Sequence, residues 1–448
     1  MIPDSNFITS LLNVSESDIE SCHIRTDGDD MIYEITLLRK PMSCPYCGAS
    51  MIGHGHKLRK INHPAVRTYH GTIYYYANRY ICKACKRTSL EQNPFGYQGF
   101  NSSYFLLQTA MKRLGNLNYN LKMISDELNI SPTQLNTYLD SYITIPRGRL
   151  PENLGIDEIH SSTLARRNSS YLCVLVDNDN SCLFDVLESR GKFYLGDHFS
   201  KIPRHERYAV KYITIDMWEP YRDLANTYFP KALVAVDPFH VIEHLCNDFQ
   251  AIRIDLMRQC EYGSNAYYLL KRWHWLFEKD NIELDNEEEY NHRFGTRLNR
   301  RDIFNMMKNT FPVLYEAYEL KEAYRRFNKT CSYENAIAVF DQYVDAFKNS
   351  GIRQYDEFVG ILEHWKPEIL NSFLRTPENW RLSNSRTENI NGKIRTYLDI
   401  SKGIGNFDRF RKRTIFALNP KIYYALTSNL KSISKPGKSR GSYNKPID

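Results

Sequence analysis

Residues 213–245 read ITIDMWEPYRDLANTYFPKALVAVDPFHVIEHL, and this stretch decides the fold predicted for the middle of the chain. A short apolar run ends at Asp216, the segment EPYRDLANTY follows with helical spacing, and a second apolar run ends at Asp237, three residues before His240. A long helical pattern comes next. Because β-branched runs bounded by turn residues predict strands, we expect a strand, a helix, a strand and a helix, with an acid closing each strand.

Upstream, the segments LGIDEIH (154–160), SSYLCVLVDND (169–179) and SCLFDVLES (181–189) predict a meander of three strands. The first of them carries Asp157. Three acids therefore lie at or near the ends of apolar strands in one unit. An acid is costly inside a core, but at strand ends carboxylates can converge on a hard cation. Aspartate is also a common turn residue, so each acid alone is compatible with a purely structural role.

Four of the ten cysteines form two C-x-x-C pairs, Cys44 with Cys47 and Cys82 with Cys85, separated by 34 residues. Two such pairs can offer four thiolates to one tetrahedral zinc ion. Residues 66–80 between them are rich in β-branched and aromatic residues, which predicts the strands of a zinc ribbon. The alternatives are chance pairing, or replacement of one cysteine by a histidine from the set His54, His56, His63 and His70.

Residues 102–141 change to a helical period. Ser131 is a good N-cap and Pro132 fits the first turn of the helix that follows it. A helix, a tight turn and a capped second helix outline a helix-turn-helix. Plain helical hairpins share this pattern, but its position directly after a basic zinc ribbon favours DNA binding. The second helix would present these side chains to a DNA groove: Thr133, Gln134, Asn136 and Thr137.

Near the C-terminus, residues 381–413 read RLSNSRTENINGKIRTYLDISKGIGNFDRFRKR. Ser383 or Ser385 can cap a helix that carries Glu388. A carboxylate there, among basic and amide groups, suits a metal ion beside a phosphate backbone, although an ordinary solvated helix would look the same. The basic residues that we expect near DNA are Arg395, Lys402, Arg409, Arg411, Lys412 and Arg413.

The charge is unevenly distributed. The chain of 448 residues has a net charge of +7, yet residues 39–90 hold ten Lys/Arg and no acid, and residues 386–448 hold fourteen Lys/Arg against four acids. Two basic segments around an acidic remainder suit a polyanionic partner; a solubilising surface with a basic tail is the alternative. No run approaches the ~18 apolar residues of a membrane span, and no basic leader precedes an apolar segment. We expect no membrane association and a cytoplasmic location at the bacterial nucleoid.

Taken in order, these motifs resemble the bacterial insertion-sequence transposases of the ISL-three family, which belong to the DDE superfamily. The resemblance extends from about Cys44 to Pro420. It is carried by CPYCG and CKAC, LGIDE, the stretch 213–245, SNSRTENINGKIR and GIGNFDRFRKR. It implies a multidomain α+β protein in which a zinc ribbon and a helix-turn-helix precede a ribonuclease-H-like α/β catalytic core that has a large all-helical insertion.

The resemblance also implies three carboxylates that bind two Mg²⁺ ions, with Mn²⁺ as a substitute, and one structural Zn²⁺ on the four cysteines. Motif by motif, Asp157 and Glu388 are two of the carboxylates. For the other we favour Asp216 over Asp237, because the fourth strand of that core neighbours the first, whereas the fifth lies ~4.8 Å further out. A two-metal site needs ligands that converge on ions about 3.5–4 Å apart. Asp237 and His240 would then be accessory.

The function implied is binding of terminal inverted repeats, cleavage of the element ends and joining of the 3′-hydroxyls to target DNA, by a homodimer on double-stranded DNA. Two other hypotheses remain: a sequence-specific DNA-binding protein with an inactive core, and a structure-specific ribonuclease or resolvase on the same core. The expected domains are an unassigned segment (1–40), the zinc ribbon (41–95), the helix-turn-helix (100–145), the first part of the core (152–248), the helical insertion (249–380), the completion of the core with the Glu388 helix (381–420) and a basic tail (421–448).

Overall fold

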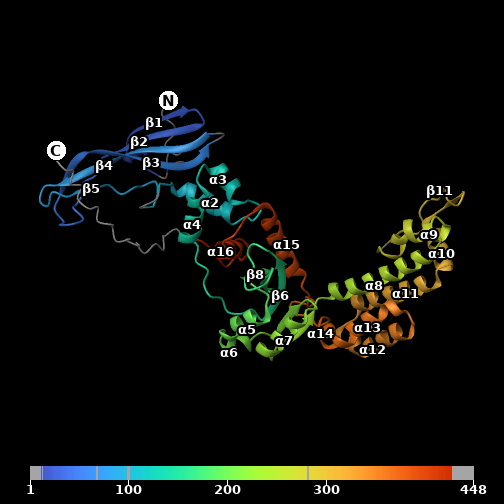
Figure 1. Cartoon of the computed structure of the whole chain (residues 1–448). Helices are drawn as coiled ribbons and strands as arrows, with labels where there is room; N and C mark the ends of the chain where they lie inside the picture. The colour runs from blue at the N-terminus through green and yellow to red at the C-terminus, as the bar shows by residue number, and fades with distance from the viewer. Residues whose placement is uncertain (1–11, 13, 67–68, 98–100, 280–281, 426–448) are drawn as a thin grey trace, which may run out of the picture. The chain divides into compact units, whose positions relative to one another are not determined.

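A computed structural model describes residues 12, 14–66, 69–97, 101–279 and 282–425 (Figure 1). The chain divides into two compact units, one made of residues 1–147 and 393–448 and the other of residues 148–392. The boundary after Gly392 falls inside one helix, α15 (Ser385–Ile400). Among the described residues, no helix is both long enough and apolar enough to cross a membrane.

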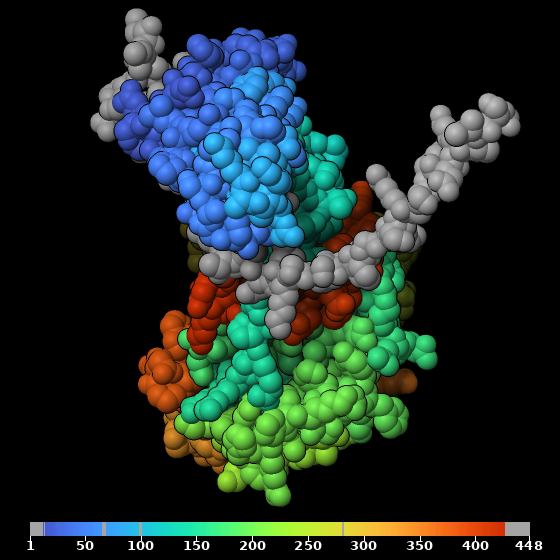
Figure 2. All heavy atoms as spheres, turned by 90° about the vertical axis from the view of Figure 1, so that its left-hand side faces the viewer, coloured from blue at the N-terminus to red at the C-terminus, as the bar shows by residue number. Residues whose placement is uncertain are grey.

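The first unit contains a five-stranded sheet in the order β1-β2-β4-β3, with β5 also paired to β4. Its strands, which follow the short helix η1 (Glu16–Asp18), are β1 (Ile19–Asp27), β2 (Asp30–Leu37), β3 (Met51–Val66), β4 (Tyr69–Cys82) and β5 (Thr88–Leu90). The long antiparallel pair β3 and β4 confirms the strands predicted between the two cysteine pairs. The strands β1 and β2 come from residues 1–40, a segment whose sequence shows no motif and was therefore unassigned. In Figure 2 these strands form the blue surface.

Four helices follow in the same unit. They are α2 (Tyr104–Leu114), α3 (Leu121–Leu128), α4 (Pro132–Tyr142) and α16 (Phe407–Leu418). As predicted, Ser131 caps α4, since its side chain accepts a hydrogen bond from the backbone N–H of Gln134. Asn129 ends α3 in the left-handed conformation, with φ at 51°. The helices enclose an apolar core that includes Leu107 and Leu135, and α16 packs against α4.

The second unit is built on a sheet in the order β10-β9-β6-β7-β8. The strands are β6 (Asn153–His160), β7 (Tyr171–Asp177), β8 (Cys182–Leu187), β9 (Tyr212–Ile215) and β10 (Leu233–Val236). β6, β7 and β8 form the antiparallel meander that the sequence predicted, while β9 runs parallel to β6 and β10 runs parallel to β9. The strand of Asp216 is therefore next to the strand of Asp157, and that of Asp237 is one position further out.

Helices connect and follow these strands. They are α5 (Lys192–Ser200), α6 (Arg204–Arg207), α7 (Glu219–Tyr228) and α8 (Pro238–Gln259). The first three give the bright green surface of Figure 2. Since α8 begins directly after β10, the first turn of this long helix lies at the same edge of the sheet as the end of β9.

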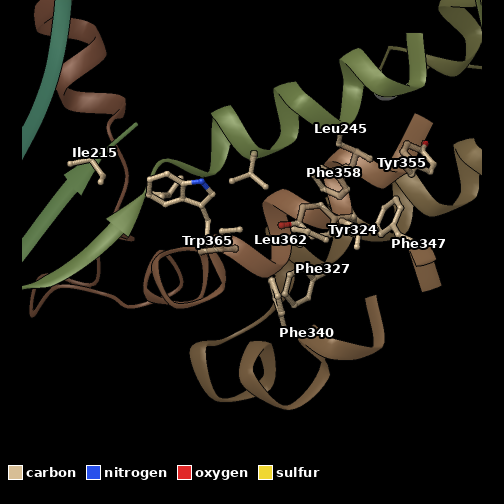
Figure 3. Close-up of a cluster of buried hydrophobic side chains, with 14 of the residues drawn as sticks. Ile215, Leu245, Tyr324, Phe327, Phe340, Phe347, Tyr355, Phe358, Leu362 and Trp365 are labelled. Carbon is tan, nitrogen blue, oxygen red and sulfur yellow. The ribbon is translucent and has the colours of Figure 1, made fainter. Parts of the chain in front are cut away.

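The rest of the second unit is mainly helical. Its elements are α9 (Asn265–Arg272), η2 (His274–Phe277), α10 (Arg300–Thr310), α11 (Pro312–Thr330), α12 (Tyr333–Asn349), η3 (Arg353–Tyr355), α13 (Asp356–His364) and α14 (Lys366–Asn371). Aromatic side chains from α11, α12 and α13, such as Tyr324, Phe347 and Phe358, gather near Leu245 of α8 (Figure 3). They form one continuous apolar core with the sheet.

The expectation that residues 249–380 are all helical is wrong at one place. A short hairpin, β11 (Glu289–Asn291) and β12 (Thr296–Leu298), interrupts the helices. Its residues are mostly exposed, so the acidic segment offers no apolar face for a helix to bury. Gly295 supplies the left-handed turn, with φ at 66°.

Candidate active site and metal centres

The two cysteine pairs meet because the β3–β4 hairpin folds back on itself. Cys44 and Cys47 precede β3, whereas Cys82 ends β4 and is paired with Met51 at the start of β3. The Sγ atoms of Cys44 and Cys85 are 3.6 Å apart, and those of Cys47 and Cys82 are 3.5 Å apart. All four sulfurs lie within 4.8 Å of one another. A tetrahedral zinc ion with Zn–S bonds of about 2.3 Å separates its ligands by about 3.8 Å, so this cluster fits zinc.

A tight backbone turn follows each cysteine pair. Gly48 and Lys86, each placed directly after a pair, have φ values of 76° and 59° and close tight turns. The backbone N–H of Cys85 donates to Sγ of Cys82 at 3.5 Å, which lowers the pKa of the Cys82 thiol to about 7. His63, one of the alternative ligands, instead shares a buried hydrogen bond with Ser103. The cluster is thus made of cysteines alone.

The acidic site begins at Asp157, which is buried in β6 with 8% of its surface exposed. Its Oδ2 accepts a hydrogen bond from Nδ2 of Asn391 at 2.7 Å, and its Oδ1 accepts one from the backbone N–H of Glu158. Asn391 is three residues after Glu388 on α15, so both side chains lie on the same face of that helix. This hydrogen bond therefore fixes the Glu388 face of α15 toward β6.

The close approach of α15 to β6 depends on Gly155. A Cβ atom at this position would come within 2.2 Å of Oγ1 of Thr387. Next to this contact, the buried side chain of Asn178 donates to Oγ1 of Thr214 at 2.9 Å and is also bonded to Thr387. The sequence gives no sign of this polar network, because single Asn and Thr residues show no periodic pattern.

Asp216 follows β9 directly. Its Oδ1 is buried and has no hydrogen-bond partner among the described residues. Burial raises the pKa of Asp216 to about 7, and the negative charges of Glu158 and Asp157 add to the increase. The charge of His240 and a hydrogen bond from the backbone of Trp218 act in the opposite direction. A divalent cation at the orphaned oxygen would offset the charges of the neighbouring acids.

Asp237 has a different environment. It is the N-cap of α8, where its Oδ1 accepts the backbone N–H of Phe239 at 3.3 Å, and the backbone of Asn384 also donates to it. Burial raises its pKa. The carboxylate thus already has two backbone partners, which is the expected state of a capping residue.

His240 and Glu388 lie next to Asp237. Nε2 of His240 is 4.0 Å from Oε1 of Glu388, and Nδ1 of His240 is 3.2 Å from Oε2 of Glu243. Burial opposes protonation of His240, but Glu243 and Asp237 raise its pKa. Asp237, His240 and Glu388 form a second group whose ligand atoms lie within 4.8 Å of one another. This group includes neither Asp157 nor Asp216, although the charge of His240 also acts on Asp216.

A further set of side chains holds the loop that carries Asp216. Arg190 forms an ion pair with Glu158, the residue after Asp157, and its guanidinium lies 4.7 Å from the ring centroid of Trp218. The hydroxyl of Tyr221 donates to the other oxygen of Glu158 at 3.2 Å. The sequence gave no indication of this arrangement, because Arg190 lies in a turn far from the acidic motifs.

Some of the residues expected to contact DNA face inward. The guanidinium of Arg413 is 1% exposed and donates to the carbonyl oxygens of Leu114, Asn116 and Tyr119. From that position it cannot reach a polyanion. The side chain of Gln134 donates to the hydroxyls of Ser102 and Tyr138, so it too is engaged within its unit.

The other predicted contacts differ in exposure. Asn136, Arg411 and Lys412 are half-buried. The exposed residues of the set are Thr133, Thr137, Arg395, Lys402 and Arg409.

A family model described as a transposase, DDE_Tnp_ISL3, matches residues 154–414. The match covers more than half of the chain and runs from β6 into α16, so it contains all of the predicted acidic residues and leaves out the four clustered cysteines. A search of curated proteins found none that matches the chain.

We expect the Cys44→Ser protein to lose zinc, because three thiolates and a hydroxyl bind it far more weakly than four thiolates. Elemental analysis of the purified proteins would measure this as a fall from one zinc per chain to near zero. The control is Cys260→Ser, which lies outside the cluster and can retain its bond to the carbonyl of Leu256. A Cys44→Ser protein that retains a full equivalent of zinc would contradict the assignment.

We expect Gly155→Ala to destabilise the second unit by about 1–3 kcal/mol, because the added methyl group collides with Thr387. All five tryptophans lie in residues 148–392, so their fluorescence during urea unfolding reports on this unit. Adding Thr387→Ala should recover most of the loss by removing the oxygen. The control is Gly360→Ala in α13, where a Cβ meets nothing within 4 Å. Equal stability of Gly155→Ala and the parent would refute the close approach.

Proposed function

Because the chain belongs to the ISL3 family of DDE transposases, we propose that it binds the terminal inverted repeats of an insertion sequence, cleaves the element ends and joins their 3′-hydroxyls to target DNA. The chemistry is phosphoryl transfer between DNA strands, and the substrate is double-stranded DNA. Two such ends must be held together for the joining step, so the protein acts as a dimer on DNA.

The strand order of the second unit supports a ribonuclease-H-like catalytic core. An antiparallel meander, β6 to β8, is extended on the β6 side by β9 and then by β10, in parallel orientation. In the expected ribonuclease-H-like order the fourth strand likewise neighbours the first. The helical region from 249 to 380 is inserted between β10 with its following helix and the helix that carries Glu388.

The observation that carries the proposal is the orphaned Oδ1 of Asp216 beside Asp157. Mg²⁺ prefers carboxylate oxygens and leaves positions open for water and phosphate. Asp157, Asp216 and Glu388 supply such oxygens at the edge of the sheet where β9 ends. Asp237, whose carboxylate is occupied by two backbone N–H groups, is assigned an accessory role with His240.

Two bound Mg²⁺ ions would supply activation of a water or 3′-hydroxyl and stabilisation of the leaving oxygen. The side chains of the chain itself position the reactants. Asn391 orients the carboxylate of Asp157, and the ion pair of Glu158 with Arg190 holds the strand and the loop of Asp216. His240 lies 4.0 Å from Glu388, where its positive form would stabilise that carboxylate. The reaction requires no nucleophile from the protein.

The first unit is assigned the recognition of element ends. Its four-cysteine cluster fits a structural zinc ion, and α4 follows α3 after a short turn with Ser131 as its cap. Thr133 and Thr137 are exposed on α4, which supports presentation of this helix to a DNA groove. Asn136 is half-buried on the same helix and is retained as a weaker candidate.

The test is a Mg²⁺-dependent assay on labelled DNA that carries the element's own ends, with the parent protein, Asp216→Asn and Asp237→Asn side by side. We expect cleaved and joined products from the parent and none from Asp216→Asn. For Asp237→Asn we expect activity to fall by about 10–100-fold, which is typical when a residue that supports a metal ligand is replaced.

Each outcome separates the hypotheses. Loss in Asp237→Asn with activity retained in Asp216→Asn would move the second ligand to Asp237. Binding of the ends without cleavage by the parent, in Mg²⁺ and Mn²⁺ alike, would favour a DNA-binding protein with an inactive core.

A further inference from the structure

A cavity of about 560 Å³ lies beside the start of α8, within the second unit. Its walls come from the first turns of α8, from Leu276 and Lys279, from Ile282 and Leu284, from the helices α10 and α11, and from Arg381. Tyr318 and Phe304 form part of the apolar floor. The cationic residues of its lining are Lys279, Arg325, Arg326, Lys329 and Arg381.

The lining is strongly basic although the region around it is not. Residues 249–380 contain 18 Lys/Arg and 21 Asp/Glu, so an average surface of this region would be slightly acidic. The cavity wall instead gathers five cations and a single acid, Glu322. That acid is already paired with Lys321 and Arg325. The positive charge is therefore concentrated at this place rather than spread over the helices.

The cations differ in how they are held. Arg381 donates to the carbonyls of Ser372 and Asn328, which fixes its guanidinium in the wall. Burial lowers the pKa of Arg381 to about 10, so it remains charged at neutral pH. Lys279, Arg326 and Lys329 are exposed, and none of them forms an ion pair within the part of the chain that the structure describes. A wall with one fixed and three unpaired cations is suited to a flexible anionic chain.

The cavity adjoins the acidic site. Pro238, which lines it, directly follows Asp237 and lies on the helical turn that carries His240. Arg381 is close enough to Asp237 for their charges to interact. The cavity and the acidic site therefore share the start of α8.

We propose that this cavity, the α8–α11 groove, binds the phosphodiester backbone of the DNA strand that continues from the strand held at the acidic site. The inference rests on the proposed function, because it takes the polyanion to be the substrate DNA. Phosphates of one strand follow each other at about 3.4 Å along the duplex axis, so Arg326 and Lys329, which are three residues apart on α11, can neutralise neighbouring phosphates.

The test measures binding of the full chain to a labelled duplex of mixed sequence over a range of salt concentrations, without divalent metal. The groove variant is Arg326→Gln with Lys329→Gln. Each lost phosphate contact lowers the slope of log K against log salt by about 0.9, so we expect a fall of about 1.8. The matched control, Lys308→Gln with Arg353→Gln, removes two exposed charges of the same helical region outside the groove. Its slope should equal that of the parent.

A second comparison separates charge from folding. Arg326→Lys with Lys329→Arg retains both charges and should retain the slope of the parent. Equal slopes for the groove variant and the parent would overturn the groove, and so would equal losses in the groove variant and the control.

The proposed function is tested independently in the same preparations. If the parent protein cleaves DNA and the groove variant has the same salt slope as the parent, the groove proposal alone is refuted. A groove-dependent slope in a parent that never cleaves refutes the catalytic proposal alone. If both proposals hold, the groove variant should cleave saturating DNA at the rate of the parent, because its three proposed metal ligands are intact. It should need more DNA to reach half of that rate, because it binds DNA more weakly.

Discussion

The contact of α15 with β6 is the constraint on which the acidic site depends. Glu388 is more than 200 residues from Asp157 in sequence, and only the position of α15 brings its face to the sheet. That position needs a strand residue without a side chain, Gly155, and a polar anchor, the bond of Asn391 to Asp157. A methyl group at Gly155 would collide with Thr387, so this glycine permits the close approach of α15 to β6.

The helical region contributes by holding the edge of the same sheet. Nδ2 of Asn371, at the end of α14, donates to the carbonyl of Val234 in β10 at 2.8 Å. Arg381 then ties the segment before α15 to α11 through Asn328. With the aromatic core of α11 to α13 packed on α8, the insertion is continuous with the core of the sheet. The insertion therefore contacts two elements of the acidic site, namely the first turns of α8 and the segment that leads into α15.

The sequence predicted the elements with a clear period or a local signal. The strands around Asp157, Asp216 and Asp237, the cap at Ser131 and the four-cysteine cluster are all present in the structure. Such features are local, since burial alternates along a strand and a C-x-x-C pair bends its own backbone.

What the sequence did not predict is set by tertiary partners. The inward positions of Gln134 and Arg413 depend on Ser102 and on the end of α2, which no pattern within α4 or α16 encodes. The grouping of Glu388 with Asp237 and His240 likewise depends on tertiary structure, because α15 is far from both residues in sequence. Periodicity shows which residues are buried, but it does not show which polar groups they meet.

The central claim is that Asp157 and Asp216 together hold a divalent cation beside Glu388. The most direct measurement is a crystal structure of the protein grown with Mn²⁺, in which anomalous scattering locates the metal. The account predicts a manganese peak bonded to carboxylate oxygens of both Asp157 and Asp216. A peak bonded only to Asp237, His240 and Glu388, with Oδ1 of Asp216 still without a partner, would contradict it.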